Sequence, residues 1–281
     1  MPPYAYVCTV AEPVRNTPQG LRLFLPPEST CDYIFYDSLY KDGKNNLLGG
    51  LDKLDRGVQS FISVAPKRNR SQLGFSFALE PLFMREFKDR LFPKFLDVIW
   101  NYKIHHFGFL NLYRQYADAA MVTEALNALK TMYHYLMPKA TSATPSYYVI
   151  GVSLDDITAR AAIVNLMRTV FGPSMFIAIS HITYPLRTFS DCRIFPLAME
   201  DLPEGLTRGR DYTYGHTVSY EVDLTAKART RRSLFGYEAL WSFNRFEVCR
   251  ALWKGVAVPS PTFLNVVLCH LQAQGRLWTP D

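Results

Sequence analysis

The side chains best suited to acid–base chemistry are aspartates that follow apolar runs of the chain. Asp37, Asp118, Asp155 and Asp156 each come at or shortly after the end of such a run. A general acid and a general base must face the same reacting bond, so carboxylates that cleave bonds usually occur as a pair. These aspartates are scattered without a pair spacing, and Asp155 or Asp156 suits a helix N-cap. They therefore predict no acid–base dyad.

Other reactive patterns are incomplete or absent. The segments 74–78 (GFSFA) and 151–155 (GVSLD) approach the nucleophile elbow of serine hydrolases, but each lacks the second glycine. The sequence has no glycine-rich phosphate loop and no CxxC pair. His105 and His106 make a poor metal pair, because neighbours on a strand point to opposite faces. We therefore expect no cofactor and no bound metal.

Basic residues are in modest excess. Lys and Arg number 31 against 25 Asp and Glu, which gives a net charge of +6 over 281 residues. An excess of this size does not by itself argue for nucleic acid, and we expect no nucleic-acid partner. Two basic runs, Lys67–Arg70 and Lys227–Arg232, lie in predicted loops. They could contact an anionic polymer, although solvated loop charge is the simpler interpretation.

The elements that must position these residues follow from hydrophobic patterning. Short runs that are apolar throughout indicate strands buried on both faces. The expected strands are Tyr4–Val10, Tyr33–Tyr36, Ser60–Ala65, His106–Tyr113, Tyr147–Ser153, Met175–Ser180 and Leu234–Trp241.

Helical spacing of apolar residues fills the segments between these strands. The patterns predict helices over 81–102 and 117–137, and a third that starts after residue 156 with a stripe through Ala161 and Val164. The stripe expected in the first helix is Phe83, Phe87, Leu91, Phe95, Val98 and Tyr102. Alternating strands and helices predict a parallel sheet, either doubly wound or closed into a barrel. The length of 281 residues favours a TIM-type (β/α)8 barrel.

Several stretches, taken in order, resemble glycoside hydrolase family 18, the chitinases and chitinase-like lectins. Cys8 ends the first expected strand and Cys31 directly precedes the second, as in the disulfide-linked pair that opens the family's barrel. The segment 61–65 (FISVA) looks like the family's third strand, and 75–78 (FSFA) like the segment after it. The resemblance implies a TIM barrel, here incomplete towards the C-terminus, with a Cys8–Cys31 disulfide.

The resemblance also covers the family's catalytic signature, Asp-Gly-x-Asp-x-Asp-x-Glu. The segment 106–113 (HFGFLNLY) is similar to the strand that carries it, and Gly108 matches the signature glycine. The acidic positions of the signature fall on Phe107, Leu110, Leu112 and Arg114. The likeness continues more faintly through 145–153 and 175–184.

These departures imply loss of catalysis. In the family, one glutamic acid protonates the leaving oxygen, and a neighbouring aspartate positions the acetamido group of the substrate. Leu112 cannot accept a hydrogen bond, and Arg114 stays cationic and cannot act as a general acid. Loss of the acid alone removes about 10²–10⁴-fold of rate. We therefore expect a chitinase-like protein that is not an enzyme.

The expected function is binding of a chitin-type oligosaccharide at the C-terminal mouth of the barrel, where such folds place functional groups. The candidate contacts, all just past predicted strands, are Tyr36, Asp37, Tyr113, Arg114, His181 and Tyr184. One alternative is an active hydrolase with relocated carboxylates such as Asp37 or Asp155. Another is a basic interaction module that uses the two basic runs. The sequence names no protein partner.

We expect one barrel domain over residues 1–254 and a tail of uncertain structure over 255–281. Prolines interrupt the uncharged stretch 255–275, so no membrane span is expected. The cysteine pair and a glycosylation sequon at Asn69–Ser71 suit an oxidising, secretory or extracellular compartment. Against this, residues 1–10 do not resemble a signal peptide.

Overall fold

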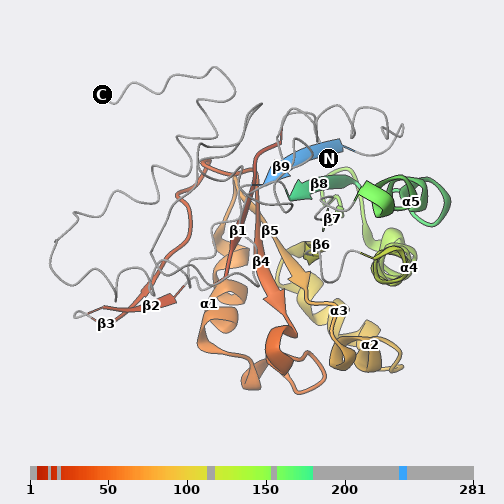
Figure 1. The fold of residues 1–281 in the computed structure, drawn as a ribbon. Coiled ribbons are helices and arrows are strands. Elements are labelled where there is room, and N and C mark those ends of the chain that lie inside the picture. Colours follow the sequence, from red (N-terminus) through yellow and green to blue (C-terminus); the bar gives the residue numbers. More distant parts are fainter. Residues whose placement is uncertain are drawn as a thin grey trace, which may run out of the picture.

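The computed structural model describes residues 5–11, 14–17, 20–112, 118–152, 157–179 and 234–238. Its centre is a seven-stranded sheet, and an antiparallel hairpin lies apart from it (Figure 1). The sheet consists of β1 (Val7–Val10), β4 (Tyr33–Leu39), β5 (Gln72–Phe77), β6 (Ile104–Leu112), β7 (Tyr148–Val152), β8 (Met175–Ile179) and β9 (Leu234–Glu238). The hairpin, which patterning did not predict, consists of β2 (Val14–Thr17) and β3 (Gly20–Leu23).

Helices follow most of these strands along the chain. They are α1 (Arg56–Val64), α2 (Pro81–Phe87), α3 (Phe92–Asn101), α4 (Ala119–Leu136) and α5 (Ile157–Thr169). Short 3₁₀ turns occupy Lys41–Gly43, Leu51–Lys53, Ala65–Lys67 and Met137–Lys139.

The order of the strands distinguishes a doubly wound sheet from a barrel, the two arrangements that the hydrophobic pattern allowed. Every adjacent pair in the sheet is parallel, and the strands follow one another across it in chain order. Right-handed crossovers that always advance in one direction place their helices on one face of the sheet. Figure 1 shows α3, α4 and α5 in succession beside the sheet. This is the winding of a β/α barrel, not of a doubly wound sheet.

The expected barrel is thus confirmed in part. Within the described residues β1 and β9 are the two edges of the sheet, so the ring is not closed there. The expected boundary at residue 254 and the tail 255–281 lie outside the described residues.

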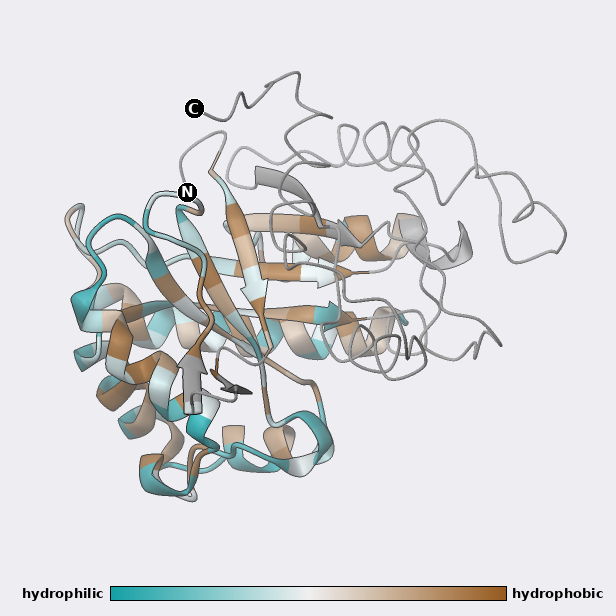
Figure 2. Ribbon diagram, turned by 90° about the vertical axis from the view of Figure 1, so that its left-hand side faces the viewer, coloured by the Kyte–Doolittle hydropathy of each residue, from teal (hydrophilic) through white to brown (hydrophobic). Residues whose placement is uncertain are grey.

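The strands of the sheet are hydrophobic over much of their length (Figure 2), because apolar side chains are buried on both of its faces. Side chains such as Ile34 and Phe75 pack towards the helices. Those on the opposite, concave face form a second cluster of Tyr33, Phe35, Leu110, Val149, Met175 and Ile177. Gly74 makes room for this cluster, because a Cβ there would lie 2.6 Å from the Phe35 ring.

The strand expected at Ser60–Ala65 is wrong, because this segment belongs to α1 and the 3₁₀ turn after it. Val58, Phe61 and Ile62 are buried with the i, i+3, i+4 spacing of a helix face. The third long strand is instead β5, so the segment 75–78 lies in and at the end of a strand rather than after one. A short apolar run fits a strand or a buried helix equally well.

The continuous helix expected over 81–102 is two helices separated by a turn. The Asp89 side chain accepts a hydrogen bond of 2.8 Å from the Leu91 N–H, which stabilises that turn, and Pro93 lies in the first turn of α3. The interruption changes the helical phase. The buried residues are Phe83, Phe92, Leu96 and Ile99, whereas Leu91, Val98 and Tyr102 of the expected stripe are exposed. In α5, likewise, Ile163 is buried and Ala161 is exposed.

The structure contains the expected disulfide. Cys8 lies in β1 and Cys31 directly precedes β4, and their Cα atoms are 6.0 Å apart. Because β1 and β4 are adjacent parallel strands, the disulfide joins the edge strand β1 to the start of the inner strand β4.

Candidate functional site

Polar side chains gather where β4, β5 and β6 end. Asp37 and Ser38 come from β4, Ser76 from β5 and Asn111 from β6, and we call these four residues the mouth cluster. The Asn111 Nδ2 donates a 2.7 Å hydrogen bond to Ser38 Oγ. The Leu110 N–H donates one of 2.9 Å to Ser76 Oγ. The cluster therefore spans three adjacent strands at the edge where β/α barrels carry their functional groups.

An irregularity in β6 brings Asn111 into this cluster. Phe109 pairs with Ile150 but Leu112 pairs with Val152, so β6 holds one more residue than β7 over this interval. Leu110 packs in the concave cluster and Leu112 in the helix-side core. A bulge of this kind re-aims the side chain between them, here Asn111.

Asn111 is absent from the predicted site residues because the prediction placed the family's signature on this strand without allowing for an extra residue. That placement put Leu112 at the mouth, whereas the bulge displaces the register by one residue. The sequence does contain one indication that Asn111 belongs to the site. It is a polar residue near the end of an otherwise apolar segment.

Asp37 is the one acidic residue in strands β1 to β8. Its Oδ1 atom is buried and has no hydrogen-bond partner among the described residues. Burial raises the pKa of the Asp37 carboxyl above its ordinary value, and the charge of Lys41 and the hydroxyls of Ser76 and Ser38 oppose this without cancelling it. A buried polar atom without a protein partner usually has an ordered water or a ligand beside it.

The raised pKa gives Asp37→Asn a predictable effect on stability. A carboxyl whose pKa is higher in the folded state than in the unfolded state costs stability as the pH rises above the unfolded value of about 3.9. The amide avoids this cost, so we expect Asp37→Asn to be more stable than the original chain at pH 7 and equal to it near pH 3. The expected gain is about 1.4 kcal/mol for each unit of pKa shift.

Urea unfolding at the two pH values measures this difference. The matched control is Asp52→Asn, which makes the same change at an exposed aspartate. An Asp37→Asn variant that is less stable than the original chain at pH 7 would show that the carboxylate is stabilised in the fold.

The other described carboxylates near this edge are engaged with the backbone. Glu80 accepts hydrogen bonds from the Asp42 and Gly43 N–H groups at 2.8 and 3.2 Å. Glu86 accepts one of 3.3 Å from the Leu48 N–H and another of 2.8 Å from the Tyr40 hydroxyl. Asp118 caps α4 by accepting the Met121 N–H at 2.7 Å. These carboxylates fix the loop after β4 and the start of α4, so they do not supply a second reactive group beside Asp37.

The remaining expected site residues are placed as follows. Tyr36 is 6% exposed and packs between the sheet and α1, with its ring 5.7 Å from that of Phe61. It lies on the helix side of β4, away from the mouth cluster. The candidates outside the described residues are Tyr113, Arg114, His181 and Tyr184, together with Asp155 and Asp156.

His106 lies at the other end of the concave face and is fully buried. Its Nδ1 accepts a 3.2 Å hydrogen bond from the Tyr147 N–H, so its Nε2 carries the proton and faces Gln72 Oε1 at 2.8 Å. Burial, together with the neighbouring His105, lowers the pKa of His106 to about 3. His106 is therefore a neutral core histidine. Among the described residues no group of His, Cys, Asp or Glu is placed to hold a metal.

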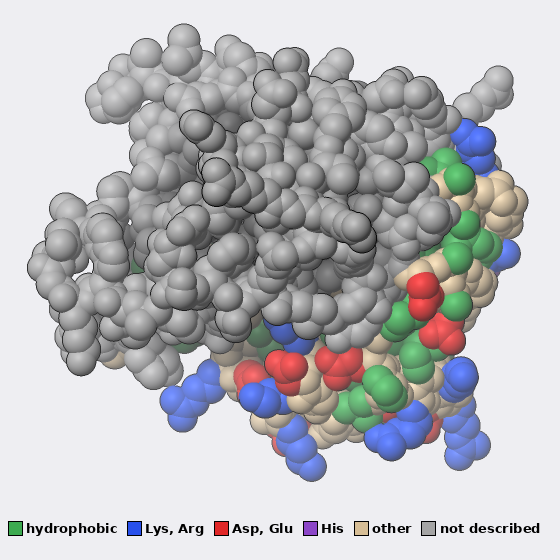
Figure 3. Space-filling view, in the orientation of Figure 1, with side chains coloured by type: hydrophobic (Ala, Val, Ile, Leu, Met, Phe, Trp, Pro, Cys, Tyr) green, Lys and Arg blue, Asp and Glu red, His purple; other side chains and the backbone are tan. Residues whose placement is uncertain are grey.

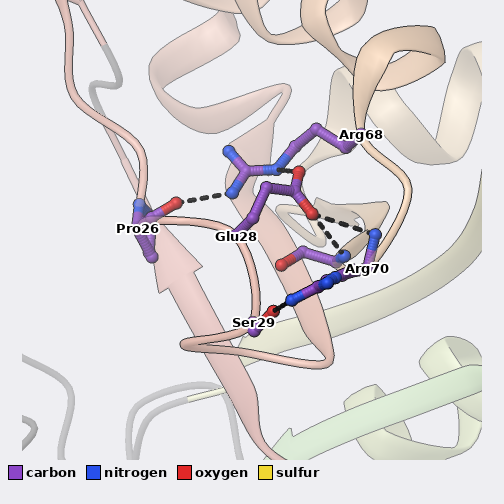
Figure 4. A network of polar contacts seen from close by, with 6 residues as sticks. Pro26, Glu28, Ser29, Arg68 and Arg70 are labelled. Atoms are coloured by element: carbon purple, nitrogen blue, oxygen red, sulfur yellow. Dashed lines mark hydrogen bonds and ion pairs between the residues drawn. The ribbon is translucent and has the colours of Figure 1, made fainter.

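The first basic run is partly neutralised within the chain (Figure 4). Arg68 Nε lies 2.7 Å from Glu28 Oε1, and its guanidinium also donates to the Pro26 carbonyl oxygen at 2.6 Å. Arg70 donates to Ser29 Oγ at 3.3 Å. On the face shown in Figure 3, basic and acidic side chains of the described residues are interspersed. The second run, Lys227–Arg232, lies outside the described residues.

None of the described helices is long and apolar enough to cross a membrane.

Comparisons with known proteins leave the family unassigned. No protein-family model matches the sequence, and no curated protein matches it. Among solved structures, the chain is similar to human YKL-39, described as "a pseudo-chitinase with retained chitooligosaccharide binding properties". The TM-score is 0.49 at 14% identity, and the match covers 82% of this chain and 65% of that one. A likeness at this level assigns neither a family nor a ligand to this chain.

Proposed function

We propose that this protein is a non-catalytic, chitinase-like protein that binds a chitin-type oligosaccharide at the C-terminal edge of its parallel sheet. The observation that carries the proposal is the mouth cluster, which gathers polar groups from three adjacent strands above an otherwise apolar concave face. The ordered resemblance of the sequence to glycoside hydrolase family 18 supplies the class of ligand.

The chemistry of the cluster suits an N-acetylated sugar. Asn111 offers both an amide donor and a carbonyl acceptor and remains partly exposed. The Ser38 hydroxyl holds the Asn111 amide in place. Asp37 adds a carboxyl group next to them. Sugar hydroxyls and acetamido groups need donors and acceptors held at fixed positions, and a rigid strand end provides them better than a loop does.

The same cluster argues against hydrolysis. Glycoside cleavage assisted by an acetamido group still needs a carboxylic acid beside the leaving oxygen and a second group that orients the acetamide. In the described residues only Asp37 supplies a carboxyl in the cluster, and the strand that resembles the family's catalytic strand ends in Asn111 and Leu112. The proposed activity is therefore binding.

Asn111→Ala tests the assignment of the site. Removing one neutral hydrogen-bonding group from a ligand contact costs about 1.4 kcal/mol, so the Kd for chitohexaose should rise about tenfold. Isothermal titration calorimetry of both proteins measures the change. The matched control is Asn127→Ala, because Asn127 is exposed on α4 and its variant should retain the original Kd. Equal affinities for Asn111→Ala and the original chain would remove the mouth cluster from the binding site.

The titration with chitohexaose also tests the alternative that the protein is an active hydrolase. If chitohexaose is cleaved, and the cleavage disappears in Asp37→Asn while binding remains, then Asp37 is a relocated catalytic carboxyl and the proposal of a non-catalytic protein fails.

A further inference from the structure

Asn69, Arg70 and Ser71 form the only Asn-x-Ser/Thr sequon in the sequence. They occupy the connection between the 3₁₀ turn Ala65–Lys67 and β5, where Asn69 is exposed. An N-linked glycan needs an acceptor asparagine on a surface loop with room for a bulky, solvated group. The position of Asn69 meets that requirement.

The neighbouring contacts fix this bend without using the Asn69 side chain. Glu28 Oε2 accepts hydrogen bonds from the Arg70 N–H at 2.9 Å and the Ser71 N–H at 3.2 Å (Figure 4). Arg68 pairs with the other oxygen of the same carboxylate. Because this network consists of Glu28, Arg68 and two backbone N–H groups, attachment of a sugar at Asn69 leaves it intact.

The disulfide gives an independent indication of the compartment. Cys8 and Cys31 are bonded, and structural disulfides form in oxidising compartments such as the endoplasmic reticulum. Asparagine-linked glycosylation is a modification of proteins that pass through that same compartment.

We propose that Asn69 is an N-glycosylation site that is modified when the chain enters the secretory pathway. In the reaction, the Asn69 amide nitrogen forms a bond to the anomeric carbon of an oligosaccharide carried on a lipid pyrophosphate. The bond from that carbon to the pyrophosphate oxygen breaks, the lipid pyrophosphate leaves, and the amide loses one proton. No oxidant or reductant is required.

The glycan would lie at the opposite end of the sheet from the mouth cluster. Asn69 precedes Gln72, the first residue of β5, whereas Ser76 lies near the end of that strand. At about 3.3 Å per residue, the length of β5 separates the two by more than 13 Å. A glycan at Asn69 therefore leaves sugar binding unchanged.

The test is secretion of the full chain from eukaryotic cells behind a supplied signal peptide. We expect treatment with peptide-N-glycosidase to reduce its mass by one glycan and to convert Asn69 to aspartate, which peptide mass spectrometry identifies. Asn69→Gln and Ser71→Ala should each abolish the mass change, and Ser71→Thr should retain it.

A second sequon serves as the positive control. Lys139→Asn creates a sequon with Thr141 at an exposed position. A glycan at this sequon shows that the oligosaccharide transferase has reached the chain. A secreted original chain without a glycan, alongside a Lys139→Asn variant that carries one, would overturn the proposal. Glycosylation of the original chain that persists in Asn69→Gln would overturn it equally.

Discussion

Phe77→Ala is expected to lower the free energy of unfolding by about 3–5 kcal/mol, the usual cost of removing a fully buried phenylalanine. Phe77 is 0% exposed and lies at the end of β5, under α2 and α3. Its ring centroid is 5.2 Å from that of Phe83 and 6.1 Å from that of Phe109. The lost ring leaves a cavity that surrounding aromatic rings cannot fill, because they are already packed against one another.

Chemical denaturation of the purified variant measures this loss. Leu91→Ala is the matched control, because Leu91 is 43% exposed in the turn between α2 and α3 and should cost less than about 1 kcal/mol. If Phe77→Ala costs no more than Leu91→Ala, then β5 does not pack against α2 and α3 as described.

Cys8→Ser, Cys31→Ser and the double variant should each lower stability by about 3 kcal/mol, the entropic effect expected for a bond that closes a loop of this size. The two cysteines are 23 residues apart in the sequence, and the intervening segment includes the β2–β3 hairpin. Without the bond, β1 keeps its parallel hydrogen bonds to β4 and the packing of Val10 in the core.

Reduction should reproduce the effect of the substitutions. Unfolding of the original chain with and without a reductant, compared with the double serine variant, separates the disulfide from any packing change. The original chain should become as labile as the variant when reduced, and the variant should not respond. Equal stability of oxidised and reduced protein would mean that the Cys8–Cys31 bond does not constrain the unfolded chain.

The sequence predicted the strands best where apolar runs are short and bounded. The expected runs at Tyr33–Tyr36, His106–Tyr113, Tyr147–Ser153 and Met175–Ser180 correspond to β4, β6, β7 and β8, and the run at Leu234–Trp241 contains β9. Their order along the chain also indicated a parallel β/α sheet. Strands of a parallel sheet are buried on both faces, so their sequences are continuous apolar runs.

The sequence failed where the outcome depends on tertiary contacts. Ser60–Ala65 has the composition of a strand but packs as a helix, because Phe61 finds its place against Phe75 of the sheet. The interruption between α2 and α3 depends on the side-chain cap of Asp89. Neither interaction is visible in a local hydrophobic pattern.

Of the six candidate sugar contacts, the structure describes Tyr36 and Asp37. A C-terminal strand edge was expected, and Asp37 lies there. Tyr36 was expected beside it but faces the helices, since neighbouring residues on a strand point to opposite faces. Asn111 was missed because the bulge in β6 is a property of the pairing with β7 rather than of either strand alone.

We propose that the mouth cluster belongs to a protein that binds a chitin oligosaccharide without cleaving it. The most direct test is a calorimetric titration of the original chain with chitohexaose, followed by mass spectrometry of the sugar recovered from the same cell. We predict a saturable heat of binding and intact hexasaccharide after prolonged incubation. Shorter products would show that the protein cleaves the sugar, and the absence of any binding heat would show that it does not bind it.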